Sequence, residues 1–301
     1  MISVVIPTFN AAQYLPKLLL ALSTQTIQYE LIILDSESTD DTCLLLSKAA
    51  IPFITVPKSS FNHGTTRNLG VELSKYEIVV FLTQDALPAS DTTLEALVKG
   101  LQNDANSAMA YGRQLPYPET DIFGRFARYI NYPEQSLVKS KSMIPQLGIK
   151  TCSCSNSFAV YKKTLLKQIG GFPKNTILGE DVTVAARFIL DGYSLVYCAE
   201  AQVYHSHTYS IPEEFRRYFD IGVFHQQQRE ILKAFRKAEA EGFRYVLDES
   251  NYLIQMNKKR LLPMQYVRTV AKLVGYRAGK LFNYFPIFLN RKLSMHRSFW
   301  K

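Results

Sequence analysis

The stretch ELIILDSESTDDTCLLLSKAA, residues 30–50, decides the fold class of this chain. Its first part is an apolar run that ends at Asp35, which is typical of a strand buried on both faces of a sheet. Its second part places Ser, Thr and Asp, residues that cap helix N-termini, before a run with helical spacing. The same strand-then-helix order recurs between residues 3 and 205. The pattern therefore predicts an α/β protein with a mostly parallel sheet flanked by helices.

The rest of the chain divides into elements by the same spacing and capping patterns. Residues 116–150 are rich in Pro and Tyr and are expected to form an irregular excursion, such as a lid. After Pro212 a helical pattern continues to about Gln255 and resumes weakly from Pro263, so we expect one domain over 1–210 and a basic helical region over 211–301. Strands are expected within 3–9 (broken by Pro7), 52–57, 77–82, 107–115, 155–172 and 194–205, and helices within 11–25, 65–75, 90–104, 155–172 and 180–193.

The composition is that of a globular protein with a large core. The chain has 301 residues, of which 47% are hydrophobic and 20% are charged. No apolar run has membrane-spanning length, and Met1 leads directly into a strand-like segment with no basic region of a signal peptide. These features predict a cytoplasmic protein, in which the four cysteines would be free thiols.

The positive charge is concentrated near the C-terminus. The formal net charge is +9, and residues 229–301 carry 16 Lys+Arg against 5 Asp+Glu. Such a region indicates an anionic partner, such as acidic lipid headgroups or a pyrophosphate-linked substrate. Its helices interleave basic and aromatic residues, which suits peripheral contact with the inner face of the cell membrane. Packing on the first domain or formation of a homodimer explains the pattern equally well. Nucleic acid is not an expected partner, because no nucleic-acid-binding module is recognisable.

Polar side chains close four of the expected strands. Thr8, Asp35, Asp85 and His205 each stand at or just after a strand's carboxyl end. Ligands of open α/β sheets gather at that edge. Any one of these residues alone reads as a helix or strand cap, whereas four at one edge indicate a ligand site.

Three other kinds of site fit the sequence less well. A dinucleotide site needs glycines after the first strand, and PTFNAAQY has none. A phosphatase with an aspartyl nucleophile would need Glu37 in LDSES to act in place of an Asp. Zinc could be drawn on Cys152 and Cys154 with the H-x-H pair, but C-x-C without a second close pair is a weak metal signal.

A set of motifs resembles the GT-A glycosyltransferases of family 2 over residues 2–210. Two of them, FNHGTTRN and TQDA, are similar to the bacterial rhamnosyltransferase branch, whose usual donor is dTDP-L-rhamnose. HSHTYS and the closing LSMHRSFW share that similarity. The motifs that carry the family resemblance are SVVIPTFN, LDSESTDDT, RNLG, LTQDA, GGF and GEDVTVAARFILDGY.

The resemblance implies an inverting, metal-dependent transfer of a sugar to a hydroxyl group of a cell-surface polysaccharide precursor in a bacterium. The family holds Mg²⁺ or Mn²⁺ with an Asp-x-Asp, which here is Thr83-Gln84-Asp85. Asp85 would remain as a ligand, together with His205 or, alternatively, His207. A neutral Thr83 suits a deoxyribose, which lacks the 2′-hydroxyl that an acid could bind. The missing acid also leaves two alternatives open: a UDP-sugar-dependent transferase, and a degenerate binding or scaffold protein.

The resemblance also assigns roles to further residues. Asp181 in the GED motif would be the general base that takes the proton of the acceptor hydroxyl. The remaining matches would bind the donor nucleotide (Pro7, Thr8, Asp35, Arg67, Thr83 and Gln84) or line the donor and acceptor pocket (Asn62, His63, Asn156 and Glu180).

Overall fold

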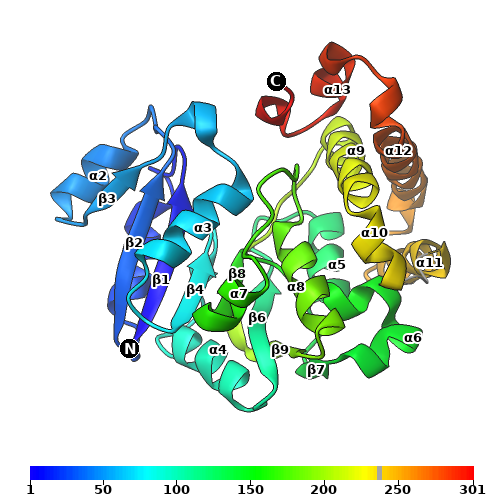
Figure 1. Ribbon diagram of the computed structural model, residues 1–301. Helices are drawn as coiled ribbons and strands as arrows, with labels where there is room; N and C mark the ends of the chain where they lie inside the picture. The colour runs from blue at the N-terminus through cyan, green and yellow to red at the C-terminus, as the bar shows by residue number, and fades with distance from the viewer. Residues whose placement is uncertain (236–238) are drawn as a thin grey trace.

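The computed structural model describes residues 1–235 and 239–301, with the side chains of residues 239–241 left aside. The described residues form a nine-stranded sheet covered by helices (Figure 1). The strands are β1 Ile2–Thr8, β2 Tyr29–Asp35, β3 Phe53–Thr55, β4 Ile78–Leu82, β5 Leu87–Pro88, β6 Ser107–Leu115, β7 Leu137–Lys139, β8 Phe158–Lys162 and β9 Ser194–Tyr204. Their order is β3-β2-β1-β4-β8-β6-β9-β5, and β7 pairs with β9.

The sheet is mixed, where the sequence led us to expect a mostly parallel one. Strands β3, β2, β1 and β4 pair in parallel, as do β6 and β9. Strand β8 is antiparallel to both β4 and β6. It is reversed because the chain leaves β6 at one edge of the sheet and, after the segment 116–157, enters β8 from that same edge. Since β8 lies between two parallel groups, the carboxyl ends of β1, β2, β4, β6 and β9 all lie at that edge.

Strand β1 runs unbroken through Pro7, so the expected break there was wrong. Pro7 pairs in register with Leu34 of β2. On its other side β1 pairs with β4 only from Ser3 to Val5, and Pro7 lies past the end of that ladder. The missing N–H of a proline is tolerated where no ladder bond is needed.

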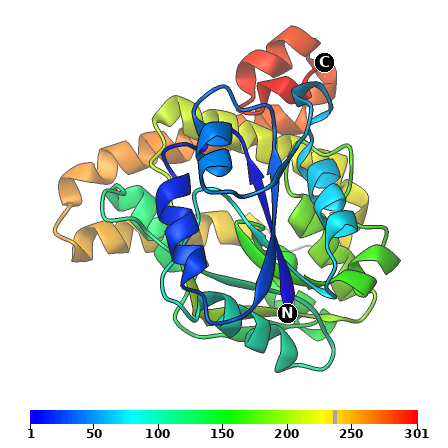
Figure 2. The ribbon, with the colours of Figure 1, turned by 90° about the vertical axis from the view of Figure 1, so that its left-hand side faces the viewer.

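Helices cover both faces of the sheet. Along β1, Val4 and Ile6 belong to one buried cluster and Val5 to the other, as the two-residue period of a strand requires. Figure 2 shows α1 and α3 on opposite sides of β1 and β2. The helices of this part are α1 Leu15–Ser23, α2 Thr42–Lys48, η1 Lys58–Ser60, α3 His63–Leu73, α4 Thr93–Gln102, α7 Lys163–Gln168 and α8 Glu180–Leu190.

The segment 116–150 is more regular than its composition predicts. Asp121 caps a helix by accepting a hydrogen bond from Gly124 N at 2.7 Å, and Phe123 and Phe126 bury one face of that helix. The proline and tyrosine residues of this segment are therefore compatible with short helices and a strand. The segment contains α5 Ile122–Asn131, β7, η2 Lys141–Met143, α6 Ile144–Leu147 and η3 Gly148–Cys152.

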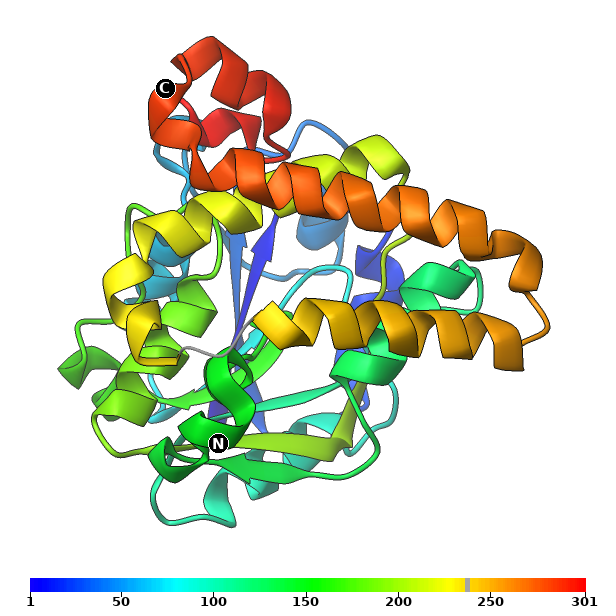
Figure 3. The ribbon, with the colours of Figure 1, turned by 90° about the vertical axis from the view of Figure 1, so that its right-hand side faces the viewer.

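The C-terminal region forms separate helices instead of one run to residue 255. The stretch 236–238, which the pattern placed inside that run, lies outside the described residues. The segment from Pro263, read as weakly helical, is a helix of 19 residues. Figure 3 shows it lying along α9, with α11 running below. The elements are α9 Ile211–Gln227, α10 Arg229–Leu232, η4 Lys233–Phe235, α11 Glu239–Gln255, η5 Lys259–Leu261, α12 Leu262–Lys280, η6 Phe282–Tyr284, α13 Ile287–Leu293 and η7 Arg297–Phe299.

Glycines allow α9 and α12 to pack with their backbones in contact. A Cβ on Gly275 would lie 2.3 Å from the carbonyl oxygen of Phe215, and one on Gly222 would lie 2.2 Å from that of Tyr276. Any side chain at these positions would push the helices apart. No helix in the described part of the chain is both long enough and apolar enough to cross a membrane.

Candidate functional site

The four polar strand ends meet at one edge of the sheet. Thr8 and Asp35 are register partners at the ends of β1 and β2, and the Thr8 hydroxyl donates to Asp35 Oδ1 at 2.9 Å. Asp85 follows β4, and His205 follows β9. The convergence predicted from the sequence is therefore present, and it results from the shared direction of these strands.

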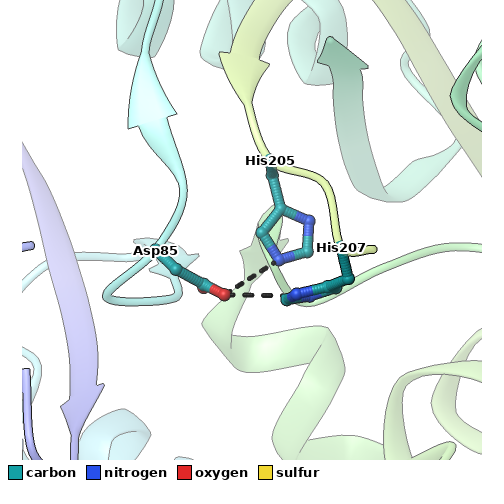
Figure 4. Close-up of side chains that lie close together, drawn as sticks. All are labelled: Asp85, His205 and His207. Carbon is teal, nitrogen blue, oxygen red and sulfur yellow. Dashed lines mark ion pairs between the residues drawn. The ribbon is translucent and has the colours of Figure 1, made fainter. Parts of the chain in front are cut away.

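Asp85, His205 and His207 form a compact cluster (Figure 4). Asp85 Oδ2 lies 3.4 Å from His205 Nε2 and 3.8 Å from His207 Nε2. The backbone N–H of His205 donates to Leu115 O at 2.9 Å, which extends the pairing of β9 with β6 by one residue. In extended backbone, side chains two residues apart project to the same side. His205 and His207 have this spacing just after β9, and both rings reach Asp85.

A buried glutamine sets the orientation of the His205 ring. Gln114 Oε1 lies 2.8 Å from His205 Nδ1, and the Arg128 guanidinium donates to the same oxygen. Because arginine can only donate, the Gln114 atom between them must be the carbonyl oxygen. His205 Nδ1 therefore carries a proton, and Nε2 faces Asp85. Gln114 was not among the site residues predicted from the sequence, although it is the last but one residue of β6, which ends at this edge.

The charges of the cluster suit a cation. Burial alone would raise the pKa of Asp85, but the hydrogen bond and charge of His205 hold it well below the usual range. Burial and the neighbouring His205 lower the pKa of His207 to about 4, so its ring is neutral near pH 7. A carboxylate and two imidazoles, with ligand atoms within 4.8 Å of one another, can hold a divalent cation. Mg²⁺ takes mainly oxygen ligands, and imidazole nitrogens are more typical of transition-metal sites.

A cavity of about 340 Å³ opens beside Asp85. The Tyr117 hydroxyl, from the segment 116–150, donates to the backbone carbonyl of Asp85 at 3.1 Å and closes one side of it. Of the residues that line the cavity, only Gln84, Asp85 and His207 were predicted from the sequence. The lining residues are Gln13, Tyr14, Lys17, Leu18, Gln84, Asp85, Leu87, Tyr117, Glu119, Ser206 and His207.

Asp181 lies in the first turn of α8, near the same edge but outside the lining of that cavity. Its Oδ2 accepts the backbone N–H of Asn156 at 2.9 Å. The next residue, Ser157, accepts the N–H of Thr83 at 3.1 Å, so the start of β8 connects Asp181 to the loop that carries Asp85. Burial and the Glu180 carboxylate raise the pKa of Asp181 to about 6. A carboxylate with that pKa can accept a proton at neutral pH.

Glu180 and Arg67 form a buried ion pair at 2.9 Å. Burial would raise the pKa of Glu180, but Arg67 and His63 lower it overall. The Asn156 amide joins the pair by donating to Glu180 Oε1 at 3.2 Å, and it accepts from the Tyr161 hydroxyl at 2.7 Å. These contacts orient α8 and leave Arg67 Nε as a buried donor without a hydrogen-bond partner among the described residues.

Several residues expected to touch a donor have their side chains occupied by the protein. Asp35 is fully buried, and its oxygens accept hydrogen bonds from Thr8, Ser38 and Cys43, so a base could reach it only after the loop around it moves. The Gln84 amide makes two hydrogen bonds with the backbone of Phe9, at 2.8 and 3.0 Å. Asn62 caps α3 through its Oδ1 and donates to Thr176 O.

The C-terminal tail folds back onto this side of the site. The ring of His296, in LSMHRSFW, lies 5.3 Å from that of His63, in FNHGTTRN. The Asp220 carboxylate holds the tail by accepting from the N–H groups of Met295 and His296, at 2.9 and 3.1 Å. Two motifs that lie far apart in sequence, and resemble one branch of one family, are therefore in contact. The zinc site that the sequence disfavoured does not form: in the described part of the chain the cysteines are free, and the cluster of metal-binding residues contains none.

Comparison with known proteins agrees with this architecture. Residues 3–170 match the family described as glycosyl transferase family 2. The chain is 42% identical to the O-antigen chain rhamnosyltransferase RfbN of Salmonella typhimurium, over 99% of this chain and 96% of that protein. It is 43% identical to the O-antigen chain rhamnosyltransferase WbaN of Salmonella anatum, over 99% and 95%.

A solved structure confirms the expected GT-A fold with a C-terminal helical region. The mannosyltransferase PcManGT from Pyrobaculum calidifontis, in complex with GDP-Man and Mn²⁺, superposes with a TM-score of 0.62 at 18% sequence identity. The match covers 91% of this chain and 86% of that one. At this identity the similarity establishes the fold alone.

Proposed function

The chain belongs to glycosyl transferase family 2, and on that premise we propose that it moves L-rhamnose from dTDP-L-rhamnose to a hydroxyl group of a cell-surface polysaccharide precursor, by inversion. The observation that carries the proposal is the similarity to two O-antigen chain rhamnosyltransferases over nearly the whole chain. It extends beyond the family domain into the C-terminal helices, which a shared fold alone would not require.

Asp85, His205 and His207 would hold the divalent cation, Mn²⁺ in preference to Mg²⁺. When bound, the cation neutralises the charge that develops on the departing diphosphate. Gln114 fixes the His205 ring so that Nε2 faces the ion. Support comes from the donor set: one carboxylate and two imidazole nitrogens converge on one point.

Asp181 would accept the proton of the attacking acceptor hydroxyl. Its carboxylate is held by Asn156 N–H at the start of α8, and its pKa of about 6 keeps it ionised at neutral pH. Glu180 would act indirectly, since its ion pair with Arg67 holds α8 in place. We propose that the acceptor lies between Asp181 and the cavity beside Asp85.

The nucleotide would lie across the ends of β1, β2 and β4. Pro7, Thr8 and Asp35 would face the base after the Ser38 loop moves. Arg67 would approach the nucleotide with Nε, a buried donor that has no partner among the described residues. Thr83 replaces the acid of the Asp-x-Asp and favours a deoxyribose. Gln84 would contribute to the nucleotide site by holding the Phe9 backbone through two hydrogen bonds. Asn62, His63 and Asn156 would line the donor and acceptor pocket.

We also propose that residues 1–210 carry the catalysis and that the helices of 211–301 contact the inner face of the cell membrane, where a lipid-linked glycan acceptor would be found. The two parts are joined by Arg268, which donates to Tyr209 O at 2.9 Å and lies 3.9 Å from Asp121 of the segment 116–150. A homodimer is the alternative use of the helices.

The test is to incubate the purified chain with dTDP-L-rhamnose and with UDP-sugars, with Mn²⁺, with Mg²⁺ and with EDTA, and to measure nucleotide release. We expect dTDP release that needs the cation and is faster with Mn²⁺. Calorimetry with dTDP and UDP complements it, and tighter binding of UDP would favour the UDP-sugar alternative. Binding without turnover of any donor would favour the degenerate scaffold, which the missing first acid of the motif keeps open.

A further inference from the structure

Helix α12 carries its apolar residues on the outside. At 100° per residue, one side of the helix presents a row of large apolar side chains to solvent. We call this row the apolar stripe: Tyr266, Val267, Val270, Leu273 and Val274, with exposures of 55%, 53%, 57%, 54% and 51%. Surface helices of globular proteins normally show the opposite arrangement.

The opposite side of α12 is polar and buried. Gln265 and Arg268 are almost inaccessible to solvent, and the Lys272 side chain is only 14% exposed. Arg268 Nη2 pairs with Glu214 of α9 at 3.0 Å, and Lys272 Nζ lies 3.4 Å from the same carboxylate. These bonds fix the rotation of the helix, so the stripe cannot turn inward without leaving Glu214 buried and unpaired.

Basic residues accompany the stripe, and acidic ones are absent. Residues 250–301 contain 11 Lys+Arg and no Asp or Glu. Three consecutive cations, Lys258, Lys259 and Arg260, line a hollow at the turn before α12. Farther along the chain, Tyr284 and Phe288 are 83% and 73% exposed. Large apolar groups among exposed cations are the composition of helices that lie in the interface of an anionic bilayer.

We propose that the apolar stripe inserts into the surface of an anionic lipid bilayer, with the flanking cations on the headgroups. The inference deepens the membrane contact of the proposed function and is independent of which sugar is transferred. Charge decides the occupant: a second copy of the chain would bring one basic segment against another, whereas acidic headgroups neutralise it.

Insertion of the stripe would also determine how far the Asp85, His205 and His207 cluster lies from the bilayer surface. Arg268, on the side of α12 away from the stripe, donates to Tyr209 O, and the Tyr209 ring lies 5.5 Å from that of His207. The loop that carries His205 and His207 therefore lies on the side of α12 away from the stripe, at least one helix thickness, about 10 Å, from it. An acceptor sugar joined to a membrane lipid through a diphosphate would lie close to this height above the bilayer.

The test is flotation of the full chain with vesicles of phosphatidylglycerol and phosphatidylethanolamine, and with vesicles of phosphatidylcholine alone. We expect the chain to float with the anionic vesicles only. The double variant Val270→Asp, Val274→Asp should lower the partition coefficient at least tenfold. Replacing Lys258, Lys259 and Arg260 by Gln should also lower it, by about fivefold per cation, and flatten its salt dependence.

Leu20→Asp is the matched control, because Leu20 is 68% exposed on α1, far from the stripe in sequence and on another helix. It should float like the unmodified chain, and all variants should keep the same circular dichroism spectrum and the same rate of dTDP release in solution. Loss of release with retained flotation would count against the proposed function alone. Failure to float with anionic vesicles, or a dimer in light scattering that Val270→Asp, Val274→Asp dissociates, would overturn the membrane proposal.

Discussion

The edge of the sheet and helix α12 distribute charge in opposite ways. At the edge, apolar strands are buried and their polar ends, Asp85 and His207, are partly open to solvent. In α12 the charged Arg268 is buried and Val270 is exposed. The first arrangement is that of a folded core with a site at its rim. The second exposes apolar side chains to water, which is energetically unfavourable and indicates that a partner covers them.

The sharpest test of the sheet edge is Asp181→Asn. The variant keeps the shape of the side chain and removes the base, so we expect kcat to fall about 10²–10⁴-fold. Calorimetry should show unchanged Mn²⁺ and dTDP binding, because Asp181 lies outside the cation cluster. Retention of more than about a tenth of the rate would rule out general-base catalysis by this residue.

The buried charges of the C-terminal helices can be tested by Arg268→Met. The substitution leaves Glu214 with only Lys272 as an ionic partner, and we expect a loss of about 3 kcal/mol in the free energy of unfolding. Denaturant titration would measure it. Arg277→Met on the exposed side of the same helix is the control and should change stability by less than about 0.5 kcal/mol. Equal effects of the two variants would mean that Arg268 is not held as described.

Gln114→Leu tests how the edge orients its cation ligand. The variant removes the acceptor of His205 Nδ1–H, so we expect Mn²⁺ affinity to fall about 10–100-fold. Electron paramagnetic resonance of free Mn²⁺ would measure the Mn²⁺ affinity of the protein without any turnover. Gln28→Leu, at an exposed position, should bind Mn²⁺ normally. Unchanged affinity in the Gln114 variant would show that the ring needs no such support.

The smallest expected effect is on the pH profile. Asp181 acts as a base only when ionised, and its pKa is raised to about 6. The rate should therefore be constant above pH 7 and fall about tenfold per pH unit well below pH 6. The residual rate of Asp181→Asn should lack this inflection. A profile that stays flat to pH 5 would contradict the raised pKa.

Sequence patterns anticipated the sheet edge better than the C-terminal helices. The strand and helix order, the convergence of Asp35, Asp85 and His205 at one edge, and the family all followed from local spacing and motifs. The same reasoning missed helix α5 and underestimated α12. In α12 the apolar residues recur at helical spacing, but the spacing does not reveal that their side faces solvent.

What the sequence by itself determined was the α/β alternation, the family and the residues able to hold a cation or accept a proton. These properties depend on local periodicity and on the chemistry of single side chains. Only the tertiary structure decided that β8 runs in reverse, that Gln114 orients His205, that His296 meets His63, and that α12 turns its apolar side outward. Each of these depends on pairings between distant segments, such as Arg268 with Glu214, which no local pattern encodes.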